Sequence, residues 1–201
     1  MGLRVRIIGE PVGEHSLIIA NHTSWLDIVL LGGSLNAAFV SKDELGHGFL
    51  HWLADQNGTV YVKRTHVRGA KEQAMALARA LEAEKPVVVF PEGTTGPGTH
   101  LLAFRSTLLE AANYAAKDVR IVPIAVDYGS ARADVAWFEE RGSDNVLRLL
   151  GRKGTLPVKV HALAALDRSG DRKLLALQAR EAIGETLGFK LHAHSPIDAG
   201  E

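Results

Sequence analysis

The stretch IIANHTSWLDIVLL, Ile18–Leu31, joins a short apolar run to a second apolar segment through a polar interruption. A short, uncharged apolar run of this kind is typical of a buried β-strand. Thr23 and Ser24 are natural N-cap residues for a helix that starts just after them. The stretch therefore predicts a strand that passes into a helix, with His22 at the junction.

The spacing of His22 and Asp27 constrains how the two side chains can meet. An α-helix turns about 100° per residue, so two side chains five residues apart point roughly 140° away from each other. They meet if His22 lies in the loop and Asp27 in the first turns of the helix. The carboxylate then holds one ring nitrogen, and the other can take a proton from a hydroxyl. In the alternative interpretation the polar residues merely end the strand, and Asp27 complements the helix dipole.

Short apolar runs alternate with helical patterns along the rest of the chain. The runs are 3–8, 17–20, 37–40, 59–62, 87–90, 121–126 and 158–162, and the helical patterns are 70–83, 105–116 and 171–187. Such alternation predicts an α/β fold with helices packed on the faces of a sheet. We expect a single domain over 1–201, with a core of about 3–165 and a C-terminal helical segment of about 170–190.

Composition excludes several classes of protein. The chain has 201 residues, 46% of them hydrophobic, which is enough for one sizeable core. Its 23 basic and 23 acidic side chains balance, which disfavours a nucleic-acid partner. The absence of cysteine excludes disulfides, zinc–thiolate sites and a cysteine nucleophile. The N-terminal residues lack the apolar core of a signal peptide, and no window is long and uncharged enough for a transmembrane helix.

Asn21–Asp27, NHTSWLD, resembles the Asn-His-x-x-x-x-Asp signature of the glycerolipid acyltransferase family. Other blocks of that family follow in its usual order. They are FVSKDEL (Phe39–Leu45), GTVYVKR (Gly58–Arg64), VVFPEGTT (Val88–Thr95) and IVPIAV (Ile121–Val126). The resemblance covers roughly residues 3–165.

The resemblance implies a mixed β-sheet flanked by α-helices, as in glycerol-3-phosphate acyltransferases. It also implies transfer of a fatty acyl group from acyl-CoA or acyl carrier protein to the hydroxyl of a lyso-lipid, such as 1-acyl-sn-glycerol-3-phosphate, in phospholipid biosynthesis. His22 would be the general base and Asp27 would orient it. No acyl-enzyme intermediate is expected, and the chain accordingly has neither cysteine nor a Gly-x-Ser-x-Gly motif.

The matching blocks also imply substrate-binding residues. Arg64 would bind the phosphate of the acceptor, since a guanidinium offers paired N–H donors. The resemblance implies further acceptor contacts for Lys42, Glu92, Gly93 and Thr94.

The block IVPIAV (Ile121–Val126) lines the acyl-binding side in this family. The resemblance therefore implies, more weakly, that Val122, Pro123 and Ile124 contact the acyl chain. The alternative is an ordinary core strand. Pro123 cannot donate to a sheet ladder, so we expect an edge strand or a bulge there.

Thr95 departs from the family pattern, which usually has arginine at this position. The missing cation argues against strong selectivity for phosphate. Phe90–Gly98, FPEGTTGPG, is similar to the branch of the family that acylates lyso-ornithine lipid, which has no phosphate. Lyso-ornithine lipid is therefore an alternative acceptor.

A lipid acceptor implies a peripheral enzyme on the cytoplasmic face of a membrane. Glu44–Gly58 carries Phe49 and Trp52 and is either an interfacial helix or a core-facing one. We predict no metal, since Gly48 stands between His47 and His51 where the zinc motif His-Glu-x-x-His has glutamate. No cofactor is expected beyond the acyl donor. A non-catalytic lipid-binding protein and a hydrolase, in which water replaces the lipid hydroxyl, are the alternative functions.

Overall fold

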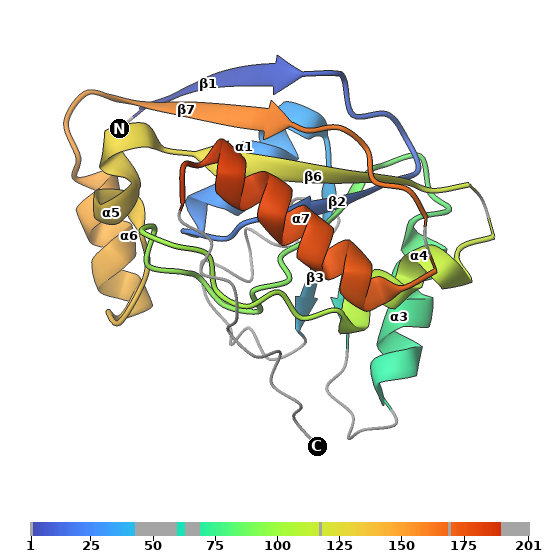
Figure 1. Ribbon diagram of the computed structural model, residues 1–201. Helices are drawn as coiled ribbons and strands as arrows, with labels where there is room; N and C mark the ends of the chain where they lie inside the picture. Colours follow the sequence, from blue (N-terminus) through green and yellow to red (C-terminus); the bar gives the residue numbers. More distant parts are fainter. Residues whose placement is uncertain (1, 43–59, 63–68, 117, 169, 190–201) are drawn as a thin grey trace.

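The computed structural model describes residues 2–42, 60–62, 69–116, 118–168 and 170–189, with the backbone alone at 40–42 and 60–62 (Figure 1). All seven apolar runs form strands, as predicted. In chain order the elements are β1 (Gly2–Gly9), β2 (Ser16–Ala20), α1 (Leu26–Leu35), β3 (Ala38–Lys42), β4 (Val60–Val62), α3 (Gly69–Ala80), β5 (Val87–Val89), η1 (Thr107–Glu110), α4 (Ala111–Tyr114), β6 (Arg120–Asp127), η2 (Gly129–Ala131), α5 (Arg132–Val135), α6 (Gly142–Leu150), β7 (Thr155–Ala162) and α7 (Arg172–Thr186).

The strands form one mixed sheet in the order β1-β7-β6-β2-β5-β3-β4. Only the β6–β7 pair is antiparallel among these neighbours; the others run parallel. The predicted fold class, a mixed sheet flanked by helices, is confirmed. β2 lies between β6 and β5, in the interior of the sheet.

The sheet has a hydrophobic core on each face. Successive residues of a strand point to opposite faces, so Leu17 and Ile19 of β2 belong to one core, and Ile18 and Ala20 to the other. Helices α3, α4 and α7 cover the first core, while α1, α5 and α6 cover the second. In Figure 1, α7 crosses in front of the sheet and α1 lies behind it. Burial on both faces explains why β2 has no polar alternation.

Pro123 interrupts the antiparallel pairing of β6. The regular register pairs Ile124 with Ala162. The next contact bridges Ile121 to Leu166, so β6 moves back three residues while its partner moves on four. This one-residue offset is a bulge. Its extra residue lies in the partner segment after β7, next to the hydrogen bond from the Leu163 N–H to the Pro123 carbonyl. The expected bulge is therefore present, whereas the edge-strand alternative is wrong because β6 is an interior strand.

Two helix boundaries differ from the sequence prediction. The N-cap of α1 is Trp25, without a side-chain cap, rather than Thr23 or Ser24. The backbone N–H groups of those two residues, which precede the helix, donate to the Asp27 carboxylate in its first turn. The pattern at 105–116 forms only the short elements η1 and α4. Helix α7 agrees with its prediction, and Asp171 caps it.

Candidate active site

The candidate site lies where three neighbouring parallel strands end. β2 pairs in parallel with both β5 and β6, so the carboxyl ends of the three strands meet at one edge of the sheet. The Asn21 side chain exchanges two hydrogen bonds with the backbone of Val126, 2.8 and 3.1 Å long, which extends the β2–β6 contact past the last strand residue. The side chains that follow these strand ends are His22 after β2, Glu92 after β5 and Tyr128 after β6.

His22 and Asp27 are in direct contact, as the loop-to-helix interpretation requires. Nδ1 of His22 lies 2.9 Å from Oδ2 of Asp27. An ionised carboxylate can only accept, so Nδ1 carries the proton and Nε2 keeps its lone pair. The His22 side chain is 15% exposed and that of Asp27 is fully buried. The contact and the partial exposure of the imidazole agree with the loop-to-helix interpretation, and the general-base role of His22 stays a prediction at this point.

Asp27 is held by four donors. Oδ2 also accepts from the backbone N–H groups of Thr23 and Ser24, at 2.6 and 2.9 Å. Oδ1 accepts from the hydroxyl of Tyr128, at 2.5 Å. Burial, and then the nearby Asp27 charge and hydrogen bond, raise the pKa of Tyr128 well above its usual value, so its hydroxyl stays protonated. These contacts compensate a fully buried carboxylate and fix its orientation toward His22.

Tyr128 was not among the predicted site residues. The sequence offers only a tyrosine two residues after the apolar run 121–126; that this run adjoins β2 is known from the sheet order alone. Phe90 was also missed as a contact of the histidine. Its ring stacks on the His22 imidazole with a centroid distance of 4.0 Å and an interplanar angle of 14°. The imidazole is thus oriented by a carboxylate at one nitrogen and by an aromatic face.

Glu92 supports the backbone around His22. Its Oε1 accepts from the backbone N–H of His22 at 2.7 Å, and its Oε2 accepts from that of Leu102 at 2.9 Å. The residue is only 4% exposed. Both oxygens are therefore engaged inside the protein, while the acceptor contact that the resemblance implied for Glu92 stays a prediction.

Burial raises the pKa of Glu92 to about 7, although the two backbone hydrogen bonds act in the opposite direction. The folded protein therefore keeps this proton up to about pH 7, whereas the unfolded chain releases it near 4.5. The free energy of unfolding therefore falls by about 3 kcal/mol in total as the pH rises from about 4.5 to about 7, because the bound proton stabilises only the folded protein in this range. We expect urea unfolding at pH 4.5–8 to show this loss in the wild type and not in Glu92→Gln. Equal pH slopes for the two proteins would contradict the shifted pKa.

The turn after Glu92 is shaped by its glycines. Gly93 has φ +72°, a conformation that favours glycine. A Cβ at Gly96 would lie 3.0 Å from Oε2 of Glu92, and the Gly96 N–H donates to the His22 carbonyl at 2.7 Å. The Thr95 hydroxyl donates to the Trp137 carbonyl at 2.5 Å. Thr95, which stands where the family usually has arginine, thus links the turn to Trp137 through a hydrogen bond.

The structure describes some of the other predicted substrate-binding residues and not others. Gly93 and Thr94 lie exposed in this turn. Arg64 and the segment 44–58 fall outside the described residues, and Lys42 is described as the last backbone position of β3. The roles predicted for all of these stay predictions.

The proposed acyl-pocket residues of β6 are buried. Val122 and Ile124 are at most 2% exposed and belong to the core under α1. Pro123 is buried as well. These positions agree with the core-strand alternative, and an acyl-binding role for them stays a prediction.

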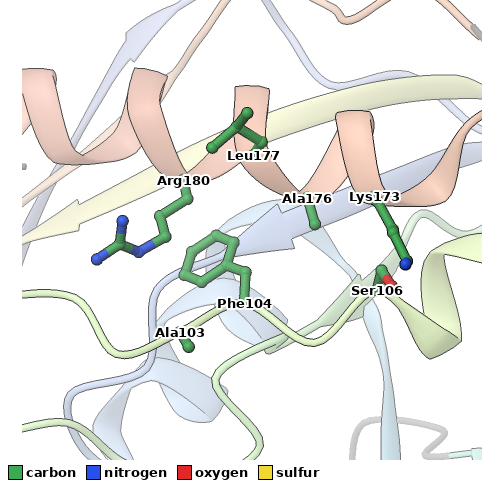
Figure 2. Close-up of a pocket in the computed structure, with 7 residues that line it drawn as sticks. All are labelled: Ala103, Phe104, Ser106, Lys173, Ala176, Leu177 and Arg180. Atoms are coloured by element: carbon green, nitrogen blue, oxygen red, sulfur yellow. The ribbon is translucent and has the colours of Figure 1, made fainter. Parts of the chain in front are cut away.

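Helix α7 supports the site from the other face of the sheet. Figure 2 shows Arg180 reaching from α7 toward the segment that contains Phe104. Its guanidinium donates to the carbonyls of Leu101 and Leu102, and the Leu102 N–H in turn binds Glu92. A cavity of about 70 Å³ lies beside Arg180 and Phe104. It is far smaller than typical ligand pockets of several hundred Å³, and none of the predicted site residues lines it.

Comparison with known proteins decides the family. The acyltransferase family model matches residues 4–127. The chain belongs to the acyltransferase family. Among the relatives of this acyltransferase is the lyso-ornithine lipid O-acyltransferase of Rhodobacter capsulatus, which is 31% identical over 94% of this chain and 71% of the relative. The lyso-ornithine lipid O-acyltransferase of Rhizobium meliloti is 32% identical over 97% of this chain and 73% of the relative.

Two further similarities involve 1-acyl-sn-glycerol-3-phosphate acyltransferases. The enzyme of Neisseria gonorrhoeae is 29% identical over 88% of this chain and 72% of the relative. The crystal structure of the enzyme PlsC from Thermotoga maritima superimposes with a TM-score of 0.60 at 21% identity, over 92% of this chain and 72% of that one. The structural match shows that the acyltransferase has the same fold. Within the described part of the chain, no helix is long and apolar enough to cross a membrane.

Proposed function

We propose that this acyltransferase moves a fatty acyl group from a thioester, acyl-CoA or acyl carrier protein, to the hydroxyl of a lyso-lipid. The observation that carries the proposal is the His22–Asp27 contact, in which the carboxylate leaves Nε2 of a partly exposed imidazole available as a base. Since both acceptor and product are lipids, we place the reaction at a membrane surface, on its cytoplasmic face.

The chemistry follows from this geometry. Nε2 of His22 takes the proton from the acceptor hydroxyl while that oxygen attacks the thioester carbonyl. Asp27 stabilises the imidazolium that forms, as a buried carboxylate beside a histidine does in other enzymes. The tetrahedral intermediate then expels the thiolate, and the imidazolium returns the proton to the sulfur. The acyl group moves directly from sulfur to oxygen, and the histidine ends in its starting tautomer.

Lyso-ornithine lipid is the acceptor that we favour. Relatives named for that activity match 94% and 97% of this chain at 31% and 32% identity. The Thr95 side chain supports the same choice, because it replaces the family's arginine and is engaged with Trp137. The second candidate acceptor is 1-acyl-sn-glycerol-3-phosphate, since a relative with that activity matches 88% of the chain at 29% identity.

The decisive experiment measures release of the thiol from an acyl thioester with and without each lyso-lipid, and identifies the product by mass spectrometry. We expect thiol release that depends on the acceptor and yields the acylated lipid, with lyso-ornithine lipid as the better acceptor. Thiol release of equal rate without any acceptor would indicate a hydrolase. Binding of lyso-lipid without thiol release would indicate a non-catalytic lipid-binding protein.

Replacing Tyr128 tests its role as a positioning residue. Tyr128→Phe keeps the ring in the core but removes the donor to Oδ1 of Asp27. We expect kcat to fall about tenfold with KM unchanged, because a hydrogen bond to a charged group is worth about 1.5–3 kcal/mol and orients the base without touching substrate. Tyr114→Phe, at an exposed tyrosine, is the matched control. An unchanged kcat in a folded Tyr128→Phe protein would show that Asp27 needs no such support.

A further inference from the structure

The side chain of Arg105 lies beside the turn that follows β5. A Cβ built on Gly93 would lie 3.5 Å from each of Cζ, Nε and Nη1 of Arg105, so the guanidinium lies beside this exposed glycine. The Arg105 backbone N–H donates to the carbonyl of Pro91 at 2.8 Å. The backbone hydrogen bond therefore anchors the residue at this turn, and its guanidinium lies beside the same turn.

The donors of this guanidinium are not used by the described part of the chain. Arg105 is exposed, and no ion pair or side-chain hydrogen bond involves it among the described residues. Its N–H groups are therefore available to a ligand, as far as the described residues are concerned. A planar cation with free donors suits the paired oxygens of a carboxylate or a phosphate.

The position of Arg105 links it to the proposed base. Glu92, next to Gly93, binds the backbone N–H of His22, and Gly96 at the end of the same turn binds the His22 carbonyl. One short turn therefore holds the backbone of His22 and has the guanidinium of Arg105 beside it. A headgroup bound by Arg105 would lie beside the turn that positions the base.

We propose that Arg105 binds the anionic group of the acceptor headgroup and thereby selects the acceptor. In lyso-ornithine lipid this group is the free carboxylate of ornithine, and in 1-acyl-sn-glycerol-3-phosphate it is the phosphate. The assignment rests on the proposed transfer to a lyso-lipid. Arg105 supplies a cation at this turn, where Thr95 supplies none.

The test uses two pairs of acceptors that differ in the anionic group. Lyso-ornithine lipid is compared with its methyl ester, and 1-acyl-sn-glycerol-3-phosphate with the corresponding monoacylglycerol. We expect the wild type to prefer the charged member of its better pair by about 10- to 100-fold in kcat/KM, mainly through KM, as a bidentate charged contact would give. Arg105→Gln should lose this preference, and Arg105→Lys should keep part of it. If Arg105→Gln loses the preference within the ornithine pair, Arg105 binds the carboxylate. If it loses the preference within the glycerol pair, Arg105 binds the phosphate.

Arg6→Gln is the control variant, because Arg6 is an exposed arginine on the edge strand β1, at the far side of the sheet order from β5. Calorimetric binding of lyso-ornithine lipid and of its methyl ester to the His22→Ala protein, with and without Arg105→Gln, gives a readout that does not require turnover. Wild-type selectivity retained by Arg105→Gln would overturn the inference and leave the proposed function intact. A wild type that acylates none of the four acceptors would end the proposed function instead.

Discussion

His22→Ala is expected to lower kcat by about 10²–10⁴-fold while the protein stays folded, because general-base catalysis typically contributes that factor. The imidazole is partly exposed, and its removal leaves the backbone contacts of His22 with Glu92 and Gly96 in place. The measurement is acceptor-dependent thiol release, accompanied by thermal unfolding of the same preparation.

His161→Ala on β7 provides the control for a histidine substitution as such, and should keep its activity. Near wild-type turnover in folded His22→Ala would contradict the assignment of the base. A loss of activity that merely followed loss of the folded state would also count against it, because the account predicts a chemical defect.

Asp27→Asn is expected to lower kcat by about 10²–10³-fold, since an amide cannot stabilise the imidazolium as a carboxylate does. The amide oxygen can still accept from Thr23, Ser24 and His22, and the amide nitrogen can donate to the Tyr128 oxygen. We therefore expect the variant to fold with a loss of about 1–3 kcal/mol in the free energy of unfolding.

Asp27→Ala is the comparison that separates orientation from stability. It leaves four donors at a fully buried position without an acceptor, so urea unfolding should show a larger loss than in Asp27→Asn. If Asp27→Asn kept full activity, the carboxylate would have only a structural role. If the alanine variant were as stable as the asparagine variant, the four contacts would contribute little.

Much of the fold could be predicted from the sequence because its strands are buried on both faces. Apolar runs such as Val87–Val89 are short and rich in β-branched residues, which favours a strand over a buried helix, and Asp171 marks the start of helix α7 as its N-cap. The pairing of β1 with β7 could not be predicted in this way, since it joins residues about 150 positions apart and no local pattern encodes it.

The candidate site was predictable to the extent that it is local. His22 and Asp27 are five residues apart, so loop and helix geometry alone allowed their contact. Tyr128 meets Asp27 across 101 positions, and Glu92 meets His22 across 70, so these contacts depend on the order of strands in the sheet. The burial of the Glu92 side chain could not be predicted either, because the sequence does not show which N–H groups a glutamate in a turn will bind.

The double variant His22→Ala/Asp27→Asn tests the central claim most directly, because two groups that act as one unit give strongly non-additive losses. We predict that kcat for acyl transfer to the lyso-lipid falls no further in the double variant than in His22→Ala alone. Losses that multiply, so that the double variant is slower than His22→Ala by the full factor of Asp27→Asn, would contradict a mechanism in which Asp27 acts through His22.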